Sequence, residues 1–123
     1  MVVNLAEVEK LLENSQHDYI KLLKILCQLE REYGTIEALI VTGNADNIKD
    51  FWKNTKVADL WKITKIADSI TNLLILKLED SPSNNHIKRR SDLLKIIAIN
   101  SAVNNRIELI IKELWSEKSS PTN

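Results

Sequence analysis

The chain has 123 residues, and its 17 Lys plus Arg balance its 17 Asp plus Glu, so the formal net charge is zero. This balance excludes a strongly basic coat over the whole surface, and the 44% of hydrophobic residues excludes a disordered chain. The single cysteine, Cys27, excludes an internal disulfide and a zinc site built from cysteines alone.

The sequence predicts an all-α fold. Two glycines and two prolines are too few for a set of strands joined by tight turns, whereas an all-helical chain needs no more. We expect a single-domain bundle of five to six helices over residues 1–118, with a flexible C-terminal tail at 119–123.

The first third of the chain predicts three short or medium helices. Apolar residues spaced three and four apart give a helix near 5–12, a restart at Asp18 and a second helix through Tyr33. Gly34 follows Tyr33 directly and suits a helix C-cap. Thr35 would then cap another short helix, which Gly43 ends.

Two long helices follow, and they carry the clearest periodicity. The first is expected near 56–80, after a short helix that contains Phe51 and Trp52. The segment 81–86 reads as a loop, and Ser91-Asp92 as the start of a helix over 91–117. This last helix carries a heptad seam, and the connecting loop of about ten residues predicts antiparallel packing. The seam residues are Leu93, Ile96, Asn100, Val103, Ile107, Ile110 and Leu114.

The sequence does not predict an enzyme. It contains no metal-binding, nucleophile or phosphate-loop motif. Its only histidines are His17 and His86, and His17 is separated from Cys27 by about 15 Å of helical rise. We expect no catalytic residue, no metal and no cofactor. The longest apolar runs are too short to cross a bilayer, and Glu7 and Glu9 argue against a signal peptide, so we expect a cytoplasmic protein without membrane contact.

Lys88, Arg89 and Arg90 form the most concentrated positive charge. If the helix starts at Ser91, these residues lie in the preceding loop, because cations at a helix N-terminus oppose the macrodipole at a cost of about 0.3–1 kcal/mol. They are either a solvated loop or a contact for a phosphate backbone, with first-turn amides as additional donors. Three cations alone would give weak, salt-sensitive binding.

A second candidate basic edge is formed by Lys49, Lys53 and Lys56. Trp52 and Trp61 are interleaved with these lysines, and aromatic side chains can stack on bases. The alternative interpretation, which we favour, is that both tryptophans fill the core.

Two residues of the last helix are candidates for a partner interface. Asn100 interrupts the apolar seam, where one polar residue can fix the register or the partner at a cost in stability. It could equally form a hydrogen bond inside the monomer. Trp115 could anchor another subunit or cap the bundle.

The segment REYGTIEALIVTGNADNIKDFWKNTKVADLWKITKIADSI, residues 31–70, resembles the small subunit of archaeal type I-A CRISPR interference (Cascade) complexes. The resemblance rests on the Tyr-Gly-Thr-Ile run, the nearby Asn-Ala and the long helix that follows, and it covers about a third of the chain. It implies a non-enzymatic helical subunit of an antiviral ribonucleoprotein, with Lys88, Arg89 and Arg90 as candidate contacts to guide RNA or target DNA.

We therefore predict a non-catalytic helical subunit of a nucleic-acid-associated effector complex, with other protein subunits as partners and homo-oligomers possible. Two alternatives belong to other classes. One is a helical chaperone or adaptor that binds a partner helix in an apolar groove. The other is a homodimeric scaffold that uses the last-helix seam and binds no nucleic acid.

Overall fold

The computed structural model describes residues 5–15, 18–43, 51, 53–80 and 86–119. Within these residues the fold is all-α, without strands, which confirms the predicted fold class. Within the part of the chain that the structure describes, four helices have defined bounds, compared with the five to six predicted. They are α1 (Leu5–Ser15), α2 (Tyr19–Val41), α4 (Val57–Glu79) and α5 (His86–Ser119).

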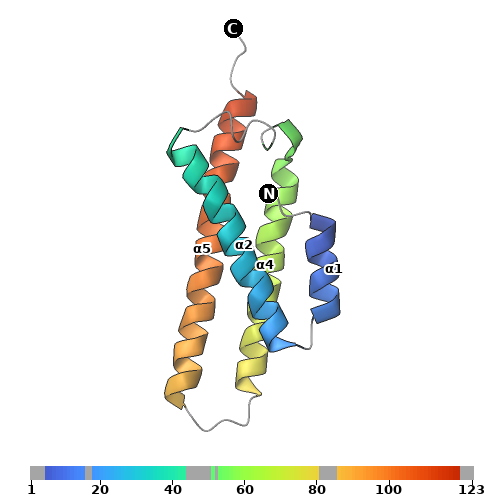
Figure 1. Ribbon diagram of the computed structural model, residues 1–123, viewed down its shortest axis with the longest axis vertical. Coiled ribbons are helices and arrows are strands. Elements are labelled where there is room, and N and C mark those ends of the chain that lie inside the picture. The colour runs from blue at the N-terminus through green and yellow to red at the C-terminus, as the bar shows by residue number, and fades with distance from the viewer. Residues whose placement is uncertain (1–4, 16–17, 44–50, 52, 81–85, 120–123) are drawn as a thin grey trace.

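The two longest apolar patterns form an antiparallel pair, as predicted. In Figure 1, α4 and α5 lie side by side with opposite directions, and α2 packs across both of them. The short helix α1 packs against α2 and α4. The predicted helix at 56–80 agrees within one residue at each end with α4, whose N-cap is Lys56 and whose C-cap is Asp80.

The prediction that a helix ends at Gly34 is wrong, because α2 continues through Gly34 to Val41. Gly34 has a packing role instead: a Cβ built there would lie 2.6 Å from Nη1 of Arg106, so a side chain at this position would displace the end of that guanidinium. Arg106 reaches α2 from α5, and its Nη2 donates to Oε1 of Glu30 at 2.9 Å. Its Nη1 lies 3.7 Å from Oε1 of Glu37.

Of the other cap signals, Thr35 does not cap a helix, because it lies inside α2, where its Oγ1 donates to the backbone carbonyl of Arg31 at 3.0 Å. Asp18 and Gly43 act as the sequence indicates. Asp18 caps α2, and its Oδ1 accepts from the backbone N–H of Lys21 at 3.1 Å. This cap separates α1 from α2 at the predicted restart. Gly43 follows the C-cap Thr42 with a φ of 69°, a left-handed conformation that glycine adopts without steric cost.

The heptad seam of α5 lies inside the bundle. Its Ile96, Val103, Ile107, Ile110 and Leu114 are all buried, and they pack with buried residues of α2 and α4 in one cluster. Burying one such side chain stabilises the fold by about 1.5–3 kcal/mol. Because the seam is buried within the monomer, it is not an exposed surface for a second copy in this fold.

Candidate interaction surface at the start of α5

The helix α5 begins at His86 rather than at Ser91, so Lys88, Arg89 and Arg90 are helical and not part of a loop. The first turn contains no acidic residue. Lys and Arg are good helix formers, and the macrodipole penalty of about 0.3–1 kcal/mol is small beside the packing of a long helix, which explains the earlier start. The cations therefore sit where the exposed amide groups already create a positive potential.

The three cations point in different directions. Successive residues of an α-helix are rotated by about 100°, so Lys88 and Arg90 project from nearly opposite sides of α5. Both are exposed, whereas Arg89 is half-buried. The arrangement forms a cationic collar around the beginning of the helix rather than a single row that could follow one strand.

Exposed apolar side chains lie directly beside these cations. Ile87 is 85% exposed, Leu94 57% and Ile97 46%. The neighbouring Ile96 is 1% exposed, so apolar residues cover both the inner and the outer side of this half of α5. Exposed apolar side chains that lie close together can mark an interaction site. This feature was missed in the sequence analysis, although the run LLKIIAI at 93–99 carries the signal.

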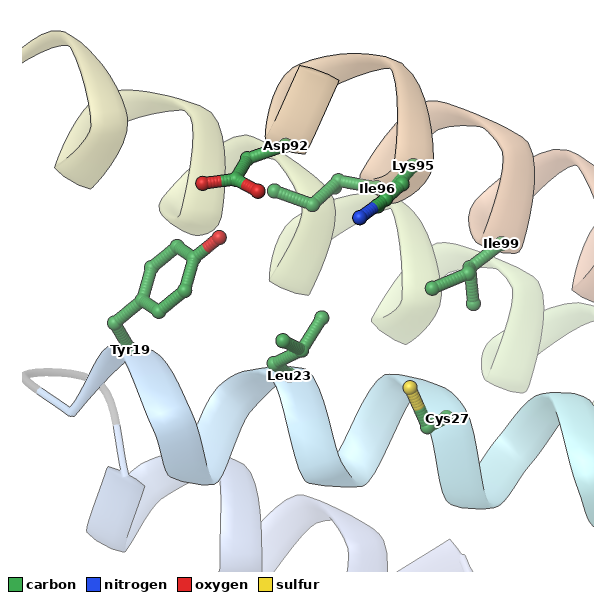
Figure 2. Close-up of a pocket in the computed structure, with 7 residues that line it drawn as sticks. All are labelled: Tyr19, Leu23, Cys27, Asp92, Lys95, Ile96 and Ile99. Atoms are coloured by element: carbon green, nitrogen blue, oxygen red, sulfur yellow. The ribbon is translucent and has the colours of Figure 1, made fainter. Parts of the chain in front are cut away.

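A hollow of about 110 Å³ lies between α2 and the same half of α5 (Figure 2). Small-molecule sites usually enclose about 300–1,000 Å³, so this hollow has the size for one side chain rather than for a substrate. Apolar groups dominate its wall, and Asp92 and Lys95 add opposite charges. The lining residues are Tyr19, Leu23, Cys27, Asp92, Lys95, Ile96 and Ile99.

The hollow changes the properties of its tyrosine. Partial burial raises the pKa of the Tyr19 phenol above its usual value, and the negative charge of Asp92 adds to the shift. The shift favours the protonated phenol, which can donate a hydrogen bond. Cys27 is half-buried and lines the hollow from α2.

The second predicted basic edge does not join the first. Lys53 and Lys56 are exposed and precede α4, whereas Lys88 to Arg90 follow its other end. The helix between them has a rise of about 33 Å, so the two groups lie at opposite ends of the bundle (Figure 1). Lys49 lies outside the described residues.

The position of Trp61 differs from the one predicted for it. Trp61 is 50% exposed, so the interpretation of Trp61 as a core filler is wrong. It lies near the start of α4, on the side that does not join the buried core stripe. Phe51 is the buried aromatic residue of this region, at 4% exposure. Trp52 is outside the described residues.

Asn100 takes part in a polar network between α4 and α5. Its Nδ2 donates to Oδ1 of Asp68 at 3.0 Å, and Nδ2 of Asn104 donates to the same oxygen at 3.2 Å. Asn104 also donates to the backbone carbonyl of Asn100 at 2.9 Å. The intramolecular alternative for Asn100 therefore describes its contacts in this structure. Trp115 is 63% exposed, so it does not cap the bundle.

Among the residues that the structure describes, no group of three or more His, Cys, Asp or Glu side chains is placed to hold a metal ion. None of the described helices combines the length and the apolar character that crossing a membrane requires.

The comparisons with known proteins identify no relative. No protein-family model, no curated protein and no solved structure matches this chain. The resemblance to the small Cascade subunit therefore stays a hypothesis that rests on the residues quoted above.

Proposed function

We propose that the protein is a non-catalytic helical subunit of a larger assembly that contains nucleic acid, and that the start of α5 is its contact surface. One observation carries the proposal: exposed cations and exposed apolar side chains lie side by side over Ile87–Ile97. Cations supply the salt-sensitive attraction to phosphate, and apolar side chains supply contact area to a neighbouring protein.

The phosphate contact would use Lys88 and Arg90, the exposed members of the collar. The helix N-terminus adds to their attraction, since its amide groups and its dipole favour an anion. Two or three phosphate contacts give only weak binding alone, so the affinity of the assembly would depend on the neighbouring apolar contact as well. The CRISPR effector complexes suggested by residues 31–70 are assemblies of this kind.

A binding assay with charge reversals tests this assignment. Fluorescence anisotropy of short single-stranded RNA and DNA is measured over a salt series for the wild type and for Lys88→Glu with Arg90→Glu. The matched control reverses two exposed lysines at the other end of the bundle, Lys53→Glu with Lys56→Glu. We expect the first pair to weaken binding roughly tenfold or more and to reduce the salt dependence, and the control to have a smaller effect.

The outcomes separate the two predicted basic sites. Loss of binding only in the control pair would transfer the nucleic-acid site to the start of α4. Equal binding by all variants, or no binding by the wild type, would contradict nucleic-acid contact through either group.

The helical adaptor is a second candidate, and the hollow between α2 and α5 favours it. A cavity of about 110 Å³ with an apolar wall can accept one side chain of a partner helix. In that case a partner protein would bind without nucleic acid, and filling the hollow by Cys27→Phe would weaken the binding of this partner. Unchanged partner affinity in Cys27→Phe would argue against this use of the hollow.

A further inference from the structure

The helix α1 is the shortest of the described helices, and it rests on a short apolar stripe. It has 11 residues, whereas α2 and α4 have 23 each. The stripe consists of Leu5, Val8 and Leu12, of which Val8 is 3% exposed and the other two are partly buried. Isolated helices shorter than about 12–15 residues are marginal in water, so α1 is helical because this stripe packs on the bundle.

The charges of α1 add little to this attachment. Glu7, Glu9, Lys10 and Glu13 are all exposed. The last turn of α1 contains no basic residue, and Glu13 lies there, where the helix dipole disfavours a negative charge. The apolar stripe is therefore what holds α1 in place, and opening of α1 costs less free energy than opening of the longer helices.

An apolar groove between α2 and α4 lies beneath α1. The helix packs against both of them, on the side of α4 that faces away from α5 (Figure 1). On α4, Ile66 is two residues from Asp68, which bonds to α5, so Ile66 is rotated by about 200° from that contact. On α2, Ile25 is rotated by the same angle from Cys27, which lines the hollow facing α5. Both isoleucines pack in or against the buried core, so they form apolar walls beneath α1.

We propose that α1 is a detachable cover, and that the groove beneath it accepts the α1 helix of a second copy of this chain. The structure identifies the occupant, because it shows the stripe of Leu5, Val8 and Leu12 packed in this groove. The inference goes beyond the function proposed above, since it concerns an exchange between copies and requires no nucleic acid.

Exchange between copies keeps the contacts of the groove. Each copy carries the same stripe and the same groove, so a reciprocal exchange forms two identical contacts about a two-fold axis. Residues 16 and 17 connect α1 to Asp18, whose backbone N–H donates to the carbonyl of Ser15 at 2.9 Å. Exchange changes the path of this connection and leaves the helix packing as it is. Because the chain's own α1 competes for the groove, the exchanged dimer forms only at high concentration.

A labelled peptide with the sequence of residues 4–18 is the probe for the groove. Its fluorescence anisotropy is measured with the purified full chain, as wild type and as Val8→Glu. The buried charge of Val8→Glu releases the chain's own cover, so this variant should bind the peptide roughly tenfold or more tightly than the wild type. The same peptide carrying Val8→Glu should not bind.

The matched control for the chain is Leu11→Glu. Leu11 lies on the outer side of α1 and is 45% exposed, so the same charge there leaves the cover closed. This variant should bind the peptide as weakly as the wild type does, and circular dichroism checks that both variants keep their helicity. Binding by Val8→Glu that is no tighter than that of the wild type, or an equal increase in Leu11→Glu, would overturn the proposal.

Deletion of Gln16 and His17 tests the exchange with an unchanged stripe and groove. Without these two residues α1 cannot fold back onto its own chain, so its docking requires a second copy. Sedimentation equilibrium of the deletion variant should show a dimer, and Val8→Glu in the same background should return it to a monomer. A Gly-Ser-Gly-Ser insertion after His17 is the control and should stay monomeric. A monomeric deletion variant would contradict the exchange. No nucleic acid is present, so these results are independent of the oligonucleotide assay.

Discussion

Gly34 on α2 lies against the guanidinium group of Arg106 on α5. A glycine inside a helix costs about 1 kcal/mol relative to alanine. Here its missing side chain leaves room for the Arg106 guanidinium, which bridges to Glu30 and Glu37 across the contact between α2 and α5. The guanidinium of Arg106 thus lies in the space that a side chain at position 34 would occupy.

This pair predicts a context-dependent effect of Gly34→Ala. The three atoms nearest to the added methyl group all belong to Arg106. In an Arg106→Ala background we therefore expect Gly34→Ala to raise the free energy of unfolding by about 0.5–1 kcal/mol. In the wild type the same change displaces the guanidinium, so that gain should be lost. Urea unfolding of the four proteins of this double-mutant cycle measures the difference. The same effect in both backgrounds would contradict the steric role of Gly34.

Tyr33 makes alkaline stability depend on one side chain. It is 2% exposed, and burial raises its pKa far above the usual value of about 10, with a further contribution from the negative charge of Glu32. In the unfolded chain the phenol ionises near pH 10, whereas in the folded protein it stays protonated. The stability that this group contributes is therefore complete below pH 10 and is lost as the pH rises further.

Tyr33→Phe removes this dependence. Above pH 10 the wild type should lose up to about 1.4 kcal/mol of stability per pH unit more than the variant. The other ionisable groups are present in both proteins, so their contributions cancel in the difference. Thermal unfolding between pH 8 and about 11.5 measures the two curves. Parallel curves above pH 10 would show that the buried phenol is not the cause.

At the scale of the element, the start of α5 carries exposed positive side chains that interact unfavourably with the helix dipole. Its first turn carries no acidic residue, and Lys88 lies close to the positive end of the helix dipole. A surface retained only for helix stability would favour Asp or Glu at this position. The macrodipole therefore opposes Lys88, and the helix forms in spite of this because its buried side packs into the core.

Lys88→Glu should make the protein more stable while it weakens anion binding. We expect an increase of about 0.3–1 kcal/mol in the free energy of unfolding, because a negative charge interacts favourably with the dipole. Lys88→Gln is the neutral control and should give an intermediate value. Urea unfolding at low salt measures both variants. A loss of stability in Lys88→Glu would show that a native contact of Lys88 outweighs the dipole.

The helices also show which sequence signals are sufficient to predict where a helix begins and ends. The spacing of Leu60, Ile63, Ala67, Ile70 and Leu74 predicts α4 closely, because a buried stripe must repeat with the helical period. Gly34 and Ser91 are misleading, since a cap preference of about 1 kcal/mol is easily exceeded by the packing of a long helix. The predicted break at Gly34 and the predicted start at Ser91 fail for this reason.

At the scale of the whole molecule, the packing decides which residues can act together. The two predicted basic groups are placed at opposite ends of α4, so they cannot form one compact site. Both basic groups are visible in the sequence, but the distance between them is not, because that distance depends on the antiparallel pairing of α4 and α5. Likewise, the apolar run at 93–99 identifies a helix, but only the bundle shows which of its residues remain outside the core.

The central claim is that the start of α5 connects this chain to an assembly that contains nucleic acid. The most direct test is affinity purification of the tagged full chain from its native cells at moderate salt. Co-purified proteins are identified by mass spectrometry, and nucleic acid by absorbance. The wild type is compared with Lys88→Glu plus Arg90→Glu and with the control Lys53→Glu plus Lys56→Glu.

We predict that the wild type and the control recover several proteins together with a short RNA, and that the reversal at the start of α5 loses the RNA. Recovery of a single protein without nucleic acid by the wild type would contradict the claim and favour the adaptor. RNA recovery that is unaffected by the α5 reversal would contradict the assignment of the contact to Lys88 and Arg90.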